Sequence, residues 1–156
     1  MRQLIEDLFL SRELYSSCLL PVCEKYDLTQ TDLIILLCLD GFPQKDTATD
    51  IISMRKLTKS AVSASVRSLQ EKGLISGAHL NGNHRSVHLK LQDQAAPIVR
   101  DGLAAQEGFF KVLFNGFSEE EIEQFQGYFH RMKDNIRHFE GTNKGGAFKH
   151  GMGKAE

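Results

Sequence analysis

The chain has 156 residues, of which 41% are hydrophobic and 25% are charged. These fractions are ordinary for a soluble globular protein, and the length suffices for one compact domain with or without a dimerisation element. The longest apolar run, residues 33–39, is far shorter than a membrane span, and the N-terminal segment mixes acids and bases into its apolar pattern. Neither a membrane partner nor a signal peptide is therefore expected.

The net charge of −1 conceals an uneven distribution along the chain. Residues 55–90 contain seven Lys or Arg against one Glu, whereas residues 1–54 contain four against nine and residues 91–156 contain eight against ten. A basic block within an acidic chain is typical of a localised phosphate-binding surface. Composition alone also permits a solvated basic face.

Two helices are predicted in the N-terminal third. Apolar residues recur at helical spacing over residues 1–26, where Pro21 is expected to bend or end the helix. A second helix should begin after Thr29, because Asp32 stands three residues on and completes a capping box. Gly41 and the two residues that follow it should end that helix.

Two further helices are predicted to follow at short intervals. The first has Thr47 and Asp50 in the same capping-box spacing. The second covers residues 59–72 and should close at Gly73, which can adopt the left-handed conformation of a helix C-terminus. Its apolar residues recur at i, i+4 and i+7 and predict one buried stripe: Val62, Val66 and Leu69.

A β-hairpin is predicted next. Residues 74–80 and 86–91 are typical of strands, and the Asn-Gly-Asn at 81–83 is typical of a tight turn. In the second strand the apolar residues alternate with polar ones, so one face should be buried: Val87, Leu89 and Leu91.

The C-terminal part predicts two long helices and a tail. The first should run from a cap at Asp93 to about Phe114, and the second should begin at a capping box formed by Ser118 and Glu121. After Phe139 the composition shifts to Gly, Lys and His, which favours a flexible tail.

This order of elements predicts a mainly α-helical fold with a small β-hairpin, a winged helix-turn-helix with N- and C-terminal dimerisation helices. The expected DNA-binding domain is residues 28–92. The dimerisation arms would be residues 1–26 and 93–139, and the tail residues 140–156. Across the two-fold axis of a homodimer we expect the arms to bury Leu4, Leu8, Phe125, Phe129 and Ile136.

The helix at 59–72 holds the position of a recognition helix, the element that enters the major groove. Its outward residues are small, hydroxylated or cationic, and these types suit close approach to bases and phosphates. Serine-rich helices also line ordinary packing interfaces, but here the basic block and the hairpin lie alongside. The predicted contacts from this helix and the residue before it are Thr58, Lys59, Ser60, Ser63 and Arg67, and Ala64 is expected to face outward beside them.

The hairpin tip supplies the second predicted contact. Arg85 on a protruding loop suits the narrow and negative minor groove, although arginine at a surface turn is common. His84 suits a phosphate contact, a pH-sensitive contact or an ordinary turn position.

Several segments in the same order resemble the MarR (multiple antibiotic resistance regulator) family. They are Leu-Thr-Gln-Thr-Asp-Leu at 28–33, Ala-Thr-Asp-Ile at 48–51, Lys-Ser-Ala-Val-Ser-Ala-Ser-Val at 59–66, Leu-Gln-Glu-Lys-Gly-Leu-Ile at 69–75 and Asn-His-Arg-Ser-Val at 83–87. The resemblance covers about residues 1–139. It implies a triangular homodimer with interlocked terminal helices, a pseudopalindromic operator, and release by a small ligand or by oxidation.

The wing departs from the family pattern at two positions. The family has Asp followed by Arg or Lys and then Arg, whereas this chain has Asn83, His84 and Arg85. The pairing by which the Asp stiffens the wing is therefore absent, and only Arg85 matches. After the wing, Gln92 replaces the common Thr, which moves the expected helix cap to Asp93.

Other chemistry receives little support from the sequence. Cys18, Cys23 and Cys38 form no CxxC pair, which favours the reducing cytoplasm and inert thiols. The histidine spacing supports no metal site, and we find no catalytic motif and no cofactor motif. The predicted function is a cytoplasmic DNA-binding regulator, expected to be a repressor. The alternatives are a winged-helix protein-interaction module and a repressor that senses oxidants through Cys18.

Overall fold

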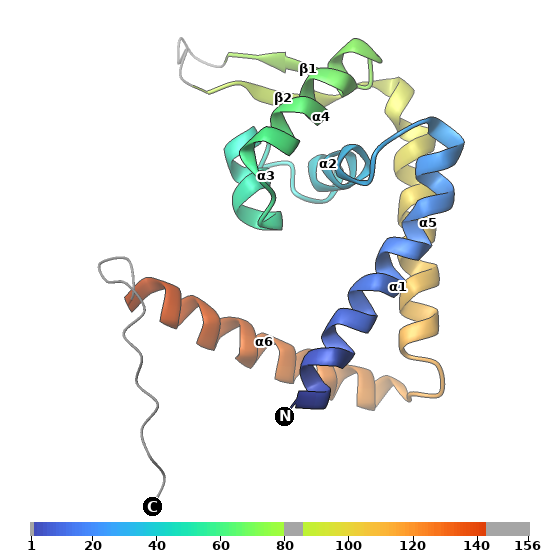
Figure 1. The fold of residues 1–156 in the computed structure, drawn as a ribbon, viewed down its shortest axis with the longest axis vertical. Coiled ribbons are helices and arrows are strands. Elements are labelled where there is room, and N and C mark those ends of the chain that lie inside the picture. The colour runs from blue at the N-terminus through green and yellow to red at the C-terminus, as the bar shows by residue number, and fades with distance from the viewer. Residues whose placement is uncertain (1, 80–85, 143–156) are drawn as a thin grey trace, which may run out of the picture. The chain divides into compact units, whose positions relative to one another are not determined.

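A computed structural model describes residues 2–79 and 86–142, which form two compact units, Met1–Leu113 and Phe114–Glu156 (Figure 1). The elements of the first unit are α1 (Arg2–Tyr26), α2 (Gln30–Gly41), α3 (Ala48–Arg55), α4 (Lys59–Glu71), β1 (Ile75–Ala78), β2 (His88–Leu91), the 3₁₀ turn η1 (Asp93–Ala95) and α5 (Ala96–Leu113). The second unit contains α6 (Glu119–Thr142). The predicted fold class, mainly helical with one small hairpin, is confirmed.

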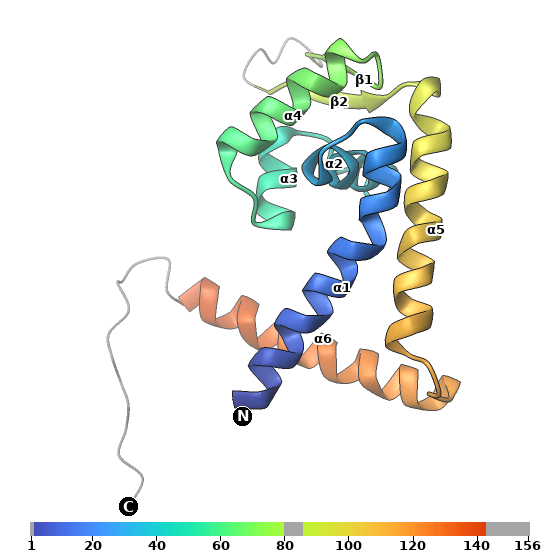
Figure 2. The same cartoon turned by 45° about the vertical axis from the view of Figure 1, so that its right-hand side comes forward.

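Helix α2 lies at the centre of the first unit, with α1, α3, α4, α5 and the hairpin around it (Figures 1 and 2). The helix is apolar on nearly every side, as expected for a helix buried in a core. Its buried apolar residues are Leu33, Ile35, Leu36, Leu37, Cys38 and Leu39. Ile51 from α3 and Val62 and Leu69 from α4 are fully buried in the same core.

Helices α1 and α5 run side by side in opposite directions (Figures 1 and 2). Tyr15 packs edge-on against Phe109, with ring centroids 5.3 Å apart, and its hydroxyl accepts a 2.7 Å hydrogen bond from Gln106. Near the other end of this contact, Asp101 Oδ2 accepts hydrogen bonds from Lys25 Nζ at 2.7 Å and from the Tyr26 hydroxyl at 2.8 Å. Packing and polar contacts together therefore fix these helices against each other.

Pro21 was predicted to bend or end α1, and the second of these alternatives is wrong, since the helix continues to Tyr26. Proline lacks the amide hydrogen that would bond to the fourth preceding carbonyl, at a cost of about 3 kcal/mol. The surrounding turn buries Leu19, Val22 and Cys23, and this packing holds the helix together. Pro21 itself faces outward.

The predicted helix starts are confirmed for α2 and α3. Thr29 and Asp32 form both hydrogen bonds of a capping box, as do Thr47 and Asp50. At the other end of the helix-turn-helix, Gly73 follows the end of α4 in the left-handed conformation, with a φ of +69°. These signals are local in sequence, and each satisfies backbone groups that a helix end leaves without partners.

Strands β1 and β2 pair antiparallel, with Ile75 opposite Leu91. Leu89 is buried and Leu91 is half-buried, as the alternation predicts. Val87 is instead 42% exposed, so its predicted burial is wrong. It precedes β2 and approaches Gly77, where an added Cβ would lie 2.8 Å from Val87 Cγ1.

The predicted cap at Asp93 is also wrong. Gln92 holds the N-cap position of η1, and its side chain makes no capping bond. The Gln92 side-chain amide instead donates to Ser76 Oγ at 2.7 Å, which ties this junction to β1. Asp93 is the first residue of the turn.

In the second unit, α6 begins as predicted. Ser118 and Glu121 exchange capping-box hydrogen bonds of 2.7 and 3.2 Å. The rings of Phe114 and Phe125 pack edge-on at 5.2 Å, and those of Phe125 and Phe129 lie 4.6 Å apart. Of the predicted tail, residues 140–142 are helical and 143–156 lie outside the described residues. Among the helices of the described residues, none is both long and apolar enough to cross a membrane.

Candidate nucleic-acid interface

Helix α4 presents one buried face and one polar face. Val62, Ser65 and Leu69 are buried against α2 and α3, and Val66 is half-buried, so the predicted apolar stripe faces the core. The residues predicted to contact DNA all lie on the opposite side and are exposed: Thr58, Lys59, Ser60, Ser63 and Arg67, with Ala64. The sequence pattern therefore placed the faces of this helix correctly.

The first turn of α4 suits a negatively charged partner. The Thr58 hydroxyl caps the helix by accepting from the Ala61 amide at 3.2 Å, and it lies 3.3 Å from Ser60 Oγ. No acidic residue stands in this turn. Helix N-termini carry partial positive charge, to which Lys59 adds a full one.

The basic block does not form one uniform surface. Lys72 donates to the backbone carbonyl of Asp27 and lies 3.4 Å from its carboxylate, and Arg55 Nε donates to Cys38 Sγ at 3.0 Å. Within the part of the chain that the structure describes, Lys59 and Arg67 form no such pairs. The available charge on α4 is thus concentrated on the face predicted to meet DNA.

The base of the wing is attached to the loop before α3. His88 Nδ1 lies 2.8 Å from Asp46 Oδ1, and both side chains are about one-quarter exposed. The Leu89 amide donates to the Asp46 carbonyl at 2.8 Å, and Thr47 forms an isolated bridge with His88. The two predicted wing contacts, His84 and Arg85, lie outside the described residues.

The contact between Asp46 and His88 was not predicted from the sequence. The two residues are 42 positions apart, and only the fold brings them together. The nearby Asp50 has its pKa lowered, chiefly because the Thr47 hydroxyl donates to its carboxylate at 2.6 Å. Two hydrogen-bonded carboxylates, those of Asp46 and Asp50, thus lie near His88 at the base of the wing.

The residues predicted for the dimer interface lie in both units, and most of them are exposed. In the first unit, Leu4 and Leu8 are about half exposed on α1. In the second unit, Phe129 and Ile136 are similarly exposed on α6, while Phe125 is half-buried between two other phenylalanine rings. Large apolar side chains exposed at this density are typical of surfaces that a partner covers.

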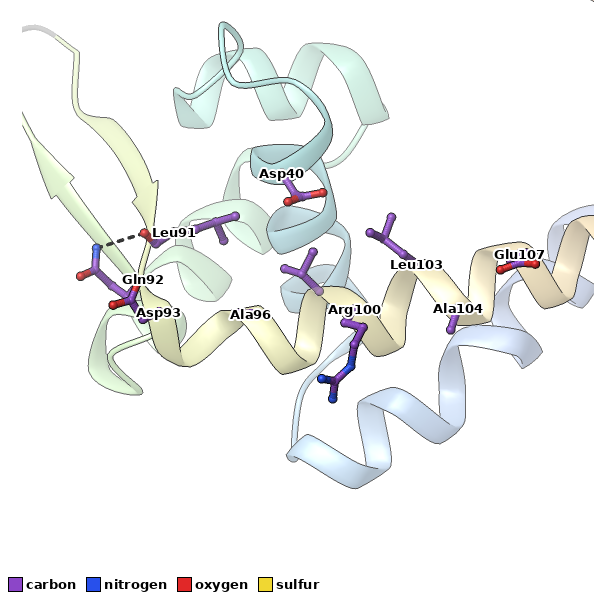
Figure 3. Close-up of a pocket in the computed structure, with 10 residues that line it drawn as sticks. Asp40, Leu91, Gln92, Asp93, Ala96, Arg100, Leu103, Ala104 and Glu107 are labelled. Atoms are coloured by element: carbon purple, nitrogen blue, oxygen red, sulfur yellow. Dashed lines mark hydrogen bonds between the residues drawn. The ribbon is translucent and has the colours of Figure 1, made fainter.

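A cavity of about 630 Å³ lies where α5 passes the end of α2 and the end of β2 (Figure 3). Leu91, Val99 and Leu103 supply apolar walls, and Asp40 supplies a carboxylate from the last turn of α2. Its volume falls in the range of about 300–1,000 Å³ that is usual for small-molecule sites. No sequence signal marked it, because its lining comes from three separate elements.

The three cysteines differ in exposure. Cys23 and Cys38 are buried, as predicted, whereas Cys18 is half-buried. Burial raises the pKa of the Cys23 thiol, and the nearby Asp32 carboxylate raises it further. Within residues 2–79 and 86–142, the structure contains no group of three His, Cys, Asp or Glu able to hold a metal ion.

Comparison with known protein families shows that residues 26–86 match the model of the MarR family. Over this segment the chain is similar to the MarR family. The matched segment spans α2, α3, α4 and β1, and so includes the whole exposed face of α4. The resemblance found in the sequence is confirmed there, and the family is one of transcription regulators rather than of enzymes.

The fold of MarR-family structures matches nearly the whole chain. A Listeria monocytogenes protein described as a MarR-family transcriptional regulator, solved with a 26-mer DNA, is 19% identical with a TM-score of 0.79, over 94% of this chain and 97% of that one. The Staphylococcus aureus MepR–DNA complex is 22% identical with a TM-score of 0.68, over 85% and 96%. Bordetella bronchiseptica BpsR, whose DNA binding is regulated by 6-hydroxynicotinic acid, is 15% identical with a TM-score of 0.68, over 84% and 98%.

Proposed function

We propose that this protein is a homodimeric transcriptional repressor that binds a pseudopalindromic operator in duplex DNA and leaves it when a small-molecule effector binds. The observation that carries the proposal is the exposed face of α4, on which Lys59 and Arg67 flank small and hydroxylated side chains. MarR-family structures solved with DNA support the assignment.

In the proposed complex, α4 enters the major groove. Lys59, in the first turn, contacts a phosphate or a guanine edge, while Arg67 two turns later contacts the backbone or a guanine. Ser60 and Ser63 let the helix approach the bases closely and offer hydroxyls for hydrogen bonds. His84 and Arg85 are proposed to contact the adjacent minor groove from the wing.

The dimer is proposed because one winged helix offers few phosphate contacts and because both units expose large apolar side chains. We propose that α1 and α6 cover these side chains across a two-fold axis, with Leu4, Leu8, Phe125, Phe129 and Ile136 at the interface. A two-fold dimer requires an operator with matching symmetry and half-sites about one helical turn apart.

Effector release is proposed to act through the cavity between α2 and α5. The cavity joins the DNA-binding elements to a helix of the dimerisation arm, so a ligand that prefers one arrangement shifts the population toward it. The BpsR structure is a case of ligand-regulated DNA binding on the same fold.

A gel-shift salt titration on an operator selected from genomic fragments tests DNA binding. The logarithm of affinity should fall linearly with the logarithm of salt concentration, since each phosphate contact contributes a slope of about −0.9. A Lys59→Ala/Arg67→Ala double variant removes four cationic side chains from each dimer, so it should bind at least tenfold more weakly, with a slope smaller by up to about 3.6.

The control removes the same charge elsewhere, in an Arg12→Ala/Lys111→Ala variant of exposed residues on α1 and α5. This variant should retain the parent's affinity to within about twofold, because a surface charge away from the contacts acts only at long range. Equal binding by the Lys59/Arg67 variant and the parent would remove α4 as the recognition helix. A parent protein that binds no DNA would favour a protein-interaction module.

A further inference from the structure

The side chains that line the cavity between α2 and α5 indicate the chemistry of its ligand. Its apolar lining includes Val99, which is buried, Leu91, which is half-buried, and Leu103, which is 46% exposed. An exposed leucine in a concave, largely apolar site supplies contact area for a hydrophobic ligand. The apolar body of a ligand would therefore cover mainly Leu91 and Leu103.

The charged groups around the cavity are not balanced. Glu107 accepts a 2.7 Å hydrogen bond from Lys111, and Arg100 Nε lies 3.4 Å from Asp101 Oδ1, although the other oxygen of that carboxylate is already bound by Lys25 and Tyr26. Figure 3 shows Arg100 pointing away from Asp40. Asp40 and Asp93 are both exposed, and within the described residues neither forms an ion pair.

The position of Asp40 makes this imbalance stronger. It stands in the last turn of α2, which contains no basic residue, and the C-terminal end of a helix carries partial negative charge. A carboxylate at that end is unfavourable for the helix, and a cation beside it would relieve the repulsion. The Asp40 carboxylate and the C-terminal end of α2 therefore both favour a positive group on this side of the cavity, whereas Asp93 lies at the N-terminal end of η1.

We propose that the cavity binds an organic cation with a flat or compact apolar body, and that compounds of this class are the effectors. The apolar part contacts Leu91 and Leu103, and the positive group lies beside Asp40. The inference about the effector rests on the proposed DNA-binding function, whereas the inference about ligand binding does not.

Three probes of equal shape and different charge test the ligand class. Biphenyl-4-carboxamidine is cationic, biphenyl-4-carboxamide is neutral and biphenyl-4-carboxylate is anionic, and calorimetric titration of the intact protein measures the affinity of each. The amidine should bind at least fivefold more tightly than the amide, and the carboxylate should bind most weakly. Equal affinities, tighter binding of the carboxylate, or no binding of the amidine would overturn the proposal.

Variants locate the binding. Asp40→Asn should weaken the amidine about two- to fivefold, the usual range for a partly exposed ion pair, and should leave the amide unchanged. Leu103→Trp should block all three probes by filling the cavity. Glu24→Gln removes an exposed carboxylate from α1 and should change nothing. An amidine affinity that is equally reduced by Glu24→Gln and Asp40→Asn would show a nonspecific charge effect and contradict the site.

Adding the amidine to the protein–DNA complex separates the two proposals. Release that is lost in Leu103→Trp supports both. Binding of the amidine to a protein that has no affinity for DNA would overturn the proposed function and leave the ligand class intact. Normal DNA binding by a protein that shows no preference for the amidine would overturn the ligand class and leave the proposed function intact.

Discussion

Two glycines in α5 test how closely this helix packs against α2. A Cβ added at Gly102 would lie 3.0 Å from Leu37 Cδ2 and 3.1 Å from Leu33 Cδ1, whereas one added at Gly108 would meet nothing within 4 Å. Alanine is favoured over glycine inside a helix by about 0.8–1 kcal/mol. Gly108→Ala should therefore stabilise the protein by up to about 1 kcal/mol.

At Gly102 the same gain is opposed by overpacking, which typically costs about 1–3 kcal/mol in a close-packed core. Gly102→Ala should accordingly change the free energy of unfolding by between about 0 and −2 kcal/mol, and should lie below Gly108→Ala by about 1–3 kcal/mol. Urea denaturation at fixed protein concentration measures both variants. Equal stabilisation by the two substitutions would refute the close approach of α5 to α2.

Three further predictions concern polar contacts and the partly buried thiol. The contacts with Lys25 and Tyr26 lower the pKa of Asp101 to about 2, so its contribution to stability is present above about pH 4 and is lost as the pH falls through 2. Asp101→Asn should flatten the fall in unfolding free energy over that range, and an unchanged pH profile would contradict the contact. A double-mutant cycle on Asp46 and His88 should give a coupling free energy of about 1 kcal/mol, and zero coupling would mean that the side chains do not hold the wing base. Cys18→Ser should leave operator release by hydrogen peroxide as in the parent, and its loss would instead identify a redox sensor.

The features predicted correctly from the sequence are those that depend on near neighbours. The capping boxes of α2, α3 and α6 need only residues three positions apart, and the two faces of α4 need only its helical period. The same holds for Gly73, whose positive φ lets the backbone turn away after α4 ends. Each signal satisfies or buries groups within one turn of helix.

The errors occur where distant contacts decide the outcome. Pro21 would end an isolated helix, but the buried residues around it hold α1 together. Val87 has the alternation of a buried strand residue, yet its side chain lies over Gly77 and stays partly exposed. The Asp46–His88 contact and the cavity beside Asp40 join separate elements, so no local pattern could reveal them.

Footprinting of the strongest genomic site by the intact protein tests the central claim most directly. The account predicts two protected half-sites, related by a two-fold axis and centred about 10 base pairs apart, with protection at both lost together in the Lys59→Ala/Arg67→Ala variant. Protection of a single half-site, or a symmetric footprint that the double variant leaves intact, would contradict a dimer that reads DNA through α4.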